Sequence, residues 1–327
     1  MRYRLMVGDE PRPVFVLGLQ RSGTTWIANL LCEHPRIAGV QAAEHRGIHE
    51  SIFFSHFARA YGDLRDDEAF GKFARHLTSS DYYLLTELPA RWLEQQRPTS
   101  YADAFRLLMN EVAHRKQASF WIEKSPHHTL LCDALAQQFP DARFVCVIRS
   151  DVGLARSRLW AYGRTPQRYP ARLLTLTRAT AANALYSRVL RRFVRRCPRA
   201  ILVTYEALAD DLEREMRRVA TFLGLAFDDR LLRSQYGANS SFGSERARAQ
   251  ALGRLDCAVV CFLAAVGRIT PLAWLGALER RRGRASELEW PAWCWTRMPR
   301  PADLPGRPVP DGARGPSMGG PHLQPHG

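Results

Sequence analysis

The sequence predicts an α/β fold in which a central parallel sheet is flanked by helices in three layers. Short apolar runs, typical of strands buried on both faces, alternate along the chain with longer segments of helical periodicity. Four of these runs lead directly into polar clusters, which begin at Arg21, Lys124, Arg149 and Tyr205. Ligands of parallel sheets bind at the carboxyl ends of the strands, so the clusters predict one site at that edge.

The first element, residues 14–31, reads VFVLGLQRSGTTWIANLL and predicts a strand, a tight loop and a helix. Residues 14–19 are apolar and branched, whereas residues 24–31 have helical spacing. The loop between them carries an arginine, a serine and two threonines. N–H groups at a helix N-terminus lack intrahelical partners, and the helix dipole favours negative charge there. The loop therefore predicts an anion-binding site.

The later elements continue the alternation of strands and helices. Strand candidates are residues 36–40, 120–123, 142–148 and 200–204. Helical spacing covers most of residues 50–116. Further helices are predicted to end near residues 138, 193 and 222, and another is predicted to begin after residue 151.

The length and composition predict one domain over residues 1–295, with a helical insert at about 47–118. Residues 296–327 are rich in proline and glycine and predict a disordered tail. A strongly apolar stretch, 258–278, lies within a helical segment at about 251–280 and is too broken to span a bilayer as one helix. It predicts a core or lid hairpin, with a membrane-docking surface as the alternative.

The formal net charge of +15 favours an anionic ligand but does not predict a nucleic-acid partner. Lysine occurs only at positions 72, 116 and 124, and no basic stripe is interleaved with stacking aromatics. The seven cysteines lack a Cys-x-x-Cys pair or zinc-type spacing, which predicts reduced thiols. Because the N-terminus has no apolar run of the signal-peptide kind, we expect a cytoplasmic protein.

The glycine loop differs from a Walker A motif at one decisive position. Gly18 and Gly23 have the spacing of Gly-x4-Gly-Lys-Ser/Thr, but Thr24 stands where the lysine belongs. A nucleotide triphosphatase needs that lysine, and an aspartate for Mg²⁺ after another strand, whereas the strongest other strand leads into Arg149. The loop can hold a phosphate-like group but is poorly equipped for metal-assisted phosphoryl transfer.

Three motifs resemble those of sulfotransferases that use 3′-phosphoadenosine 5′-phosphosulfate (PAPS). Arg21-Ser-Gly-Thr-Thr-Trp26 resembles their 5′-phosphosulfate loop, and Arg149 with Ser157 resembles their 3′-phosphate motif. Trp121-Ile-Glu-Lys-Ser-Pro-His-His128 resembles a segment of bacterial-type members. The resemblance covers roughly residues 13–242 and implies a P-loop-like fold. The family often has Arg-Asp-Pro, whereas Ser150 separates the arginine from Asp151 here, so no role is carried over to that aspartate.

The resemblance implies which residues bind PAPS. Arg21 and the backbone and hydroxyls of the loop would hold the 5′-phosphosulfate, whereas Arg149 and Ser157 would bind the 3′-phosphate with fork geometry. Tyr205 would contact the nucleotide, and Ser240-Ser241-Phe242 would close over it. The complete predicted set is Arg21, Ser22, Gly23, Thr24, Thr25, Trp26, Arg149, Ser157, Tyr205 and Ser241.

Sulfuryl transfer is an in-line displacement that needs cations on the leaving oxygen and a base, but no metal. Lys124 is the candidate for the leaving oxygen, helped by Arg21 and Thr25.

Two candidates for the base remain open. Glu44, in Glu44-His45-Arg46, resembles the catalytic glutamate of tyrosylprotein sulfotransferases. His127 or His128 resembles the histidine that follows a strand-end lysine in cytosolic sulfotransferases. We favour Glu44 over His127.

The sequence thus predicts a soluble sulfotransferase that moves a sulfuryl group from PAPS to a hydroxyl of a small molecule, carbohydrate or lipid, leaving PAP. Residues 47–118 and 251–280 are expected to form substrate or lid elements, with peripheral membrane contact through 258–278 as an alternative role. A P-loop nucleotide kinase and a non-catalytic nucleotide-binding module are the alternative functions.

Overall fold

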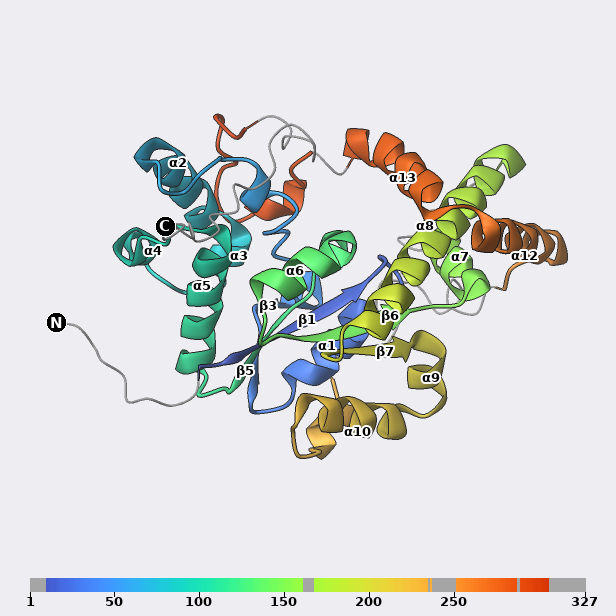
Figure 1. Ribbon diagram of the computed structural model, residues 1–327, viewed down its shortest axis with the longest axis horizontal. Helices are drawn as coiled ribbons and strands as arrows, with labels where there is room; N and C mark the ends of the chain where they lie inside the picture. Colours follow the sequence, from blue (N-terminus) through green and yellow to red (C-terminus); the bar gives the residue numbers. More distant parts are fainter. Residues whose placement is uncertain (1–9, 161–167, 235, 237–250, 287–288, 306–327) are drawn as a thin grey trace, which may run out of the picture.

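The structure, a computed structural model, describes residues 10–160, 168–234, 236, 251–286 and 289–305, and its centre is a five-stranded sheet (Figure 1). The strand order is β2-β5-β1-β6-β7, and every neighbouring pair is parallel. The predicted three-layer α/β fold is therefore confirmed. The strands are β2 (Ile37–Ala38), β5 (Phe120–Glu123), β1 (Arg12–Gly18), β6 (Arg143–Ile148) and β7 (Ala200–Thr204).

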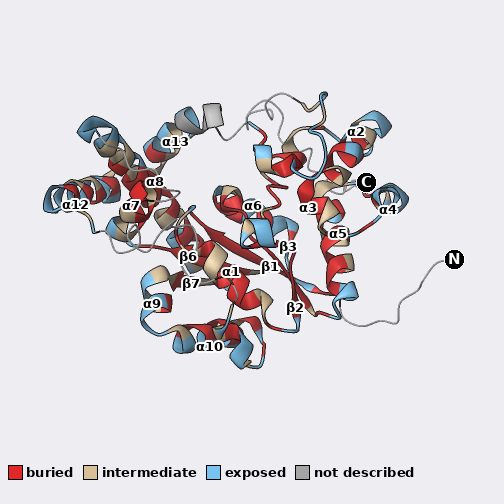
Figure 2. Ribbon diagram, turned by 180° about the vertical axis from the view of Figure 1, so that it is seen from behind, coloured by how far each residue is buried: buried red, intermediate tan, exposed pale blue. Residues whose placement is uncertain are grey.

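The two faces of the sheet bury separate apolar cores because side chains alternate along β1. Phe15 and Leu17 join the core beneath α5, α6 and the C-terminal half of α8, whereas Val14 and Val16 join the core beneath α1 and α10. Figure 1 shows the helices on either side, and the strands form the buried centre of Figure 2. These helices are α1 (Thr24–Cys32), α5 (Tyr101–Arg115), α6 (Cys132–Gln138), α8 (Tyr169–Arg196) and α10 (Leu212–Leu223).

Between β2 and β5 the chain forms a small hairpin and then a largely helical region. Three of its helices start at capping side chains, because Asp66, Ser80 and Ser100 each accept a hydrogen bond from the N–H three residues on. Its aromatic rings, including Phe53 and Phe73, extend the core that contains Phe15. The remaining elements are β3 (Gln41–Ala42), η1 (Ala43–His45), β4 (Gly47–Ile48), η2 (Phe57–Arg59), α2 (Asp67–Thr78), α3 (Asp81–Leu84) and α4 (Ala90–Gln96).

Four strands lead at their carboxyl ends into helices, which is where the sequence places its polar clusters. β1 leads into α1, β5 into η3, β6 into α7 and β7 into α9. Because the strands are parallel, all four junctions meet at one edge of the sheet. The helices at and after these junctions are η3 (Pro126–Leu131), α7 (Asp151–Trp160), α9 (Tyr205–Asp210) and η5 (Asp229–Leu232).

The apolar segment near the C-terminus forms two helices, α12 (Arg254–Ile269) and α13 (Leu272–Ser286). They are bent by 117° relative to each other, and within the described chain no single helix is long and apolar enough to cross a membrane. One side of α12 is buried and packs on α7 and α8. Gly267 allows close approach there, because a Cβ at that position would lie 2.7 Å from the Cβ of Ala184.

The last described residues pack against the helical region after β4. Trp290 and Trp295, the latter in η6 (Ala292–Trp295), join the core beside Phe57. Residues 296–305 belong to the segment predicted as a tail, yet Thr296 donates its backbone N–H to Asp81. Residues 306–327 lie outside the described part, and the division into one domain and a tail stays a prediction.

Candidate active site

The loop after β1 is tightly wound and delivers α1 with an open N-terminus. A Cβ on Gly18 would lie 2.5 Å from the carbonyl oxygen of Val147, so only glycine fits beside β6. Arg21 and Gly23 have φ values of 77° and 101°, which places both in the left-handed region. No side chain caps α1, so its first N–H groups face the loop. The hydroxyl of Ser22 is buried and has no hydrogen-bond partner.

Arg149, at the carboxyl end of β6, lies directly beside this loop. Its Nη1 donates to the carbonyl oxygen of Arg21 at 3.1 Å, and its guanidinium lies over the Tyr205 ring, 3.7 Å from the centroid. The side chain is largely buried, and this burial lowers its pKa from the usual range of arginine. Its Nε is buried without an acceptor. The group is therefore a desolvated cation with spare donor capacity.

The other predicted nucleotide contacts converge on the same place. Ser157, fully buried in α7, accepts a hydrogen bond from Arg21 Nε at 3.1 Å. The rings of Trp26 and Tyr205 lie 5.6 Å apart between centroids, and a Cβ on Gly23 would collide with the Tyr205 ring at 2.7 Å. The structure thus groups loop, β6, α7 and α9 residues around one spot. Ser241 lies outside the described residues.

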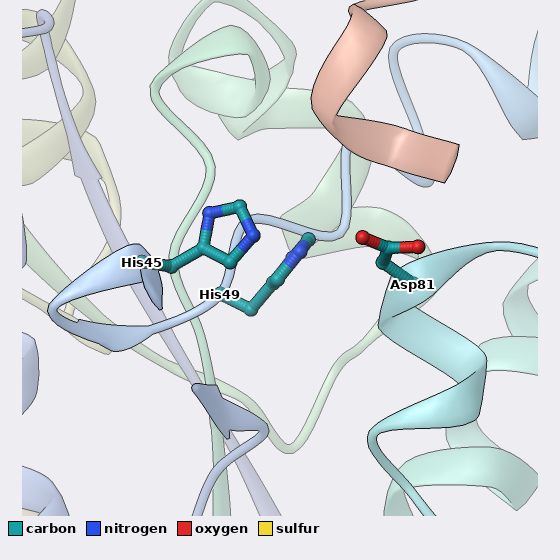
Figure 3. A group of neighbouring side chains, drawn as sticks. All are labelled: His45, His49 and Asp81. Atoms are coloured by element: carbon teal, nitrogen blue, oxygen red, sulfur yellow. The ribbon is translucent and has the colours of Figure 1, made fainter. Parts of the chain in front are cut away.

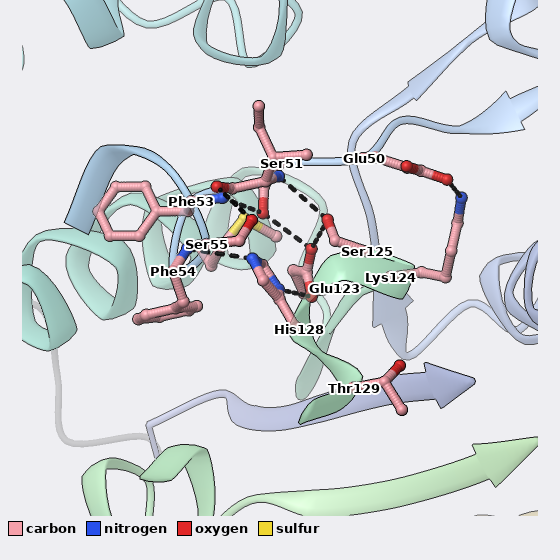
Figure 4. Close-up of polar contacts among 12 residues, drawn as sticks. Glu50, Ser51, Phe53, Phe54, Ser55, Glu123, Lys124, Ser125, His128 and Thr129 are labelled. Carbon is pink, nitrogen blue, oxygen red and sulfur yellow. Dashed lines mark hydrogen bonds and ion pairs between the residues drawn. The ribbon is translucent and has the colours of Figure 1, made fainter. Parts of the chain in front are cut away.

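Lys124, at the carboxyl end of β5, is held by a carboxylate that the sequence analysis does not identify. Its side chain is only 2% exposed, and its Nζ lies 2.7 Å from Oε1 of Glu50, just after β4 (Figure 4). The ion pair holds the buried ammonium in a fixed position. The following segment is tied to β1, since the Thr129 hydroxyl bonds both the N–H and the C=O of Gly18.

Below Lys124 lies a buried polar network centred on Glu123. Its carboxylate accepts hydrogen bonds from the hydroxyls of Ser51 and Ser125 and from Nδ1 of His128 (Figure 4). His128 Nε2 accepts the backbone N–H of Phe54, so the ring is the neutral tautomer with its proton on Nδ1. Burial alone would raise the pKa of Glu123, but His128 and the hydroxyls hold it below its usual range. Both ring nitrogens of His128 are used structurally, which leaves none for proton transfer.

The two favoured candidate bases lie in different surroundings. Glu44 forms an ion pair with Arg297, and its pKa is lowered by its own backbone hydrogen bond and by that arginine. His127 is partly buried, and this burial lowers its pKa. Its ring packs edge-on against His56, with centroids 5.7 Å apart.

A second cluster is made of His45 in η1, His49 just after β4 and Asp81 at the start of α3 (Figure 3). Its potential ligand atoms all lie within 4.8 Å of one another, so it could accept a metal ion. His49 Nδ1 lies 2.9 Å from the carbonyl oxygen of Glu50, while its Nε2 is buried without a partner. Asp81 already accepts backbone N–H groups of Thr296 and Arg297. A reaction without metal stays a prediction.

Sequence reasoning missed His49, Glu50 and Ser51 because they follow a strand too short to recognise and belong to no local motif. Glu50 meets Lys124 across 74 positions of the chain. One signal was available, since a lysine that must be buried at a strand end requires a counter-charge from elsewhere.

Known proteins resemble this chain in sequence and in structure. Residues 13–229 match the sequence model of the sulfotransferase family. No curated protein sequence matches at a significant level. Among solved structures, the chain resembles the sulfotransferase domain of the Synechococcus PCC 7002 olefin synthase, with 18% identity and a TM-score of 0.48 over 83% of this chain and 100% of that one. It also resembles the sulfotransferase domain of the curacin biosynthetic pathway, with 17% identity and a TM-score of 0.45 over 86% of this chain and 99% of that one. Mouse sulfotransferase SULT7A1 complexed with PAP has 12% identity and a TM-score of 0.34 over 85% of this chain and 87% of that one. Because the family model matches more than half of its length, the chain belongs to the sulfotransferase family.

Proposed function

We propose that the protein is a PAPS-dependent sulfotransferase that transfers a sulfuryl group to an acceptor hydroxyl and leaves PAP. The observation that carries the proposal is the convergence of Arg21, Arg149 and Ser157 at the open N-terminus of α1. The two arginines and the helix N-terminus lie together, so they can bind two anionic groups of the same ligand. Membership of the sulfotransferase family supports the same donor.

The unpartnered polar atoms fit such a ligand. A buried donor without an acceptor costs about 1–3 kcal/mol, and the Ser22 hydroxyl and Arg149 Nε are both in this state. Oxygens of a phosphate or sulfate group would satisfy both and would offset the desolvation of the guanidinium. Thr24, in place of the Walker lysine, argues against a kinase.

The chemistry that PAPS supplies is an activated sulfuryl group, whose S–O bond to the 5′-phosphate breaks as a bond from sulfur to the acceptor oxygen forms. Lys124 is assigned to the leaving oxygen, where its charge stabilises the electron pair left by the broken bond. The 2.7 Å contact with Glu50 holds the ammonium in place before the reaction. Arg21 and the α1 N–H groups are assigned to the equatorial oxygens.

The acceptor proton must pass to a base within reach of the acceptor oxygen. The contact with Lys124 adds Glu50 to the two sequence-derived candidates, Glu44 and His127. Glu44 is engaged by Arg297, whereas Glu50 lies beside the lysine assigned to the leaving oxygen, so its position leads us to favour Glu50.

We propose a small-molecule, carbohydrate or lipid alcohol as the acceptor, and a cytoplasmic site of action. The helical region at 47–118 is assigned to the acceptor pocket because it begins beside Glu50 and Lys124.

Ligand-dependent thermal unfolding tests the donor directly. PAP and PAPS should each raise the melting temperature of the full chain, whereas ATP with Mg²⁺ should not. A shift with ATP and Mg²⁺ and none with PAP would overturn the proposal in favour of a nucleotide kinase. Labelled PAPS and a panel of alcohols then test transfer. Binding of PAP without turnover across a broad panel would instead support a non-catalytic nucleotide-binding module.

A further inference from the structure

The outward side of α12 is apolar, although it lies on the surface. Asp256, Val260, Ala264 and Gly267 form the buried side of this helix, with the three- and four-residue spacing of one helical face. Leu255, Phe262, Val266 and Ile269 follow the same spacing on the exposed side. The helix therefore has two apolar sides, and only one of them is packed against the protein.

The exposure of these side chains is high even for surface residues. Leu255, Phe262 and Ile269 are 74%, 68% and 83% exposed, and Trp274, in the first turn of α13, is 72% exposed. Among large apolar side chains of the described chain outside α12 and α13, none is more than 49% exposed. Single exposed apolar residues need no explanation, but a contiguous group marks an interaction surface. We call Leu255, Phe262, Val266, Ile269 and Trp274 the α12 surface; its exposed residues are pale blue in Figure 2.

The exposed charges at the ends of α12 are positive, and on α13 the partly exposed Glu279 precedes two exposed arginines. Arg254 and Arg268 are exposed at the two ends of α12, and Arg280 and Arg281 are exposed farther along α13. The carboxylate of α12, Asp256, is buried and forms an ion pair with Arg172 of α8. The surface thus combines an apolar stripe with cationic flanks, and the whole chain carries a net charge of +15.

We propose that the α12 surface docks on an anionic lipid bilayer. Apolar side chains along a surface helix insert at the boundary between headgroups and acyl chains, tryptophan prefers that depth, and flanking arginines bind lipid phosphates. The 117° bend between α12 and α13 fits helices that lie on a membrane better than a helix that crosses it. A second copy of the chain is a poorer occupant, because a two-fold contact would bring the arginines of both copies together.

Vesicle flotation tests this docking with the full chain and no donor. The wild type should float with phosphatidylcholine vesicles that contain phosphatidylserine, and binding should fall when the salt concentration rises. The triple variant Phe262→Ser/Ile269→Ser/Trp274→Ser should bind roughly tenfold more weakly or worse. The charge variant Arg254→Gln/Arg268→Gln should lose much of the preference for phosphatidylserine.

Matched controls remove the same kinds of residue elsewhere. Leu130→Ser/Met298→Ser deletes two exposed apolar side chains, and Arg191→Gln/Arg192→Gln deletes two exposed charges on α8. Both should bind vesicles like the wild type, and circular dichroism should show all variants folded because the replaced side chains are exposed.

Three results would overturn the proposal. The first is that the wild type does not float with the vesicles. The second is that the triple variant floats as well as the wild type. The third is that the wild type binds no vesicles but self-associates in sedimentation, and that the triple variant does not self-associate. Flotation is measured without PAPS, so failure of this proposal and failure of the proposed sulfuryl transfer are distinguishable.

Discussion

Replacing Arg149 by lysine separates charge from hydrogen-bond geometry at the proposed 3′-phosphate site. Lysine keeps the positive charge beside Tyr205 but has one ammonium in place of a planar fork. In the wild type, Nη1 already serves the carbonyl oxygen of Arg21, while Nε remains available for a ligand. The single lysine nitrogen cannot occupy the positions of both Nη1 and Nε, so we expect the loss of one charge-assisted hydrogen bond, worth about 2 kcal/mol.

That energy corresponds to a Kd for PAP weakened about thirtyfold. At a PAP concentration about 100 times the wild-type Kd, binding stabilises the wild type by about 2.7 kcal/mol. The same concentration would stabilise Arg149→Lys by only about 0.9 kcal/mol. The increase in melting temperature caused by PAP should therefore shrink to about a third, and isothermal titration calorimetry gives the Kd independently.

Arg199→Lys is the matched control. Arg199 also has a fixed guanidinium, but it bonds the carbonyl oxygens of Ala136, Phe139 and Ala142 at the opposite edge of the sheet. Its replacement should lower the melting temperature of the free protein and leave the increase caused by PAP unchanged. Equal PAP-dependent increases in the wild type and Arg149→Lys would refute the assignment of Arg149.

Four further predictions concern catalysis and stability. Lys124→Met should lower kcat about 10²–10³-fold while PAP still binds, as calorimetry would show; a kcat near that of the wild type would contradict its role. Glu50→Gln should abolish turnover in assays with labelled PAPS. Full activity in Glu50→Gln together with a loss in Glu44→Gln or His127→Ala would move the base to that residue. His128→Ala should cost about 2–3 kcal/mol in urea unfolding because it leaves the buried Glu123 carboxylate with one hydrogen-bond donor fewer, whereas His127→Ala should cost far less. Chelation by EDTA should leave turnover unchanged; a loss that Zn²⁺ restores in the wild type but not in His49→Ala would instead assign a metal to that cluster.

Much of the sheet could be predicted from sequence because buried parallel strands are continuous apolar runs. The ranges 120–123 and 200–204 match β5 and β7, and the family membership expected from the motif at Arg21 is confirmed. These signals are local, since a strand, its loop and its helix are adjacent in the chain. The assignments of individual site residues stay predictions.

The contacts of Lys124 could not be predicted in the same way. Its partner Glu50 follows a strand of only two residues, and a pattern that short has no periodicity to read. The hydrogen bond from Thr296 to Asp81 could not be predicted either. A proline-rich composition indicates weak burial, and it does not say which distant carboxylate the segment contacts. Long-range polar pairs depend on the completed fold rather than on any one segment.

The contacts of the last described residues constrain the order in which the chain can assemble. Asp81, Glu44 and His76 find their partners Thr296, Arg297 and Asp303 between 215 and 253 positions later. Closing such long loops is entropically costly and slow, and during synthesis it must wait until residues 296–303 have left the ribosome. The parallel sheet and its anion-binding loop draw on residues up to about 205, so they can form first. The contacts at Glu44, His76 and Asp81 therefore form last. A chain truncated before residue 296 would lack these contacts while it keeps every residue of the sheet and of the anion-binding loop.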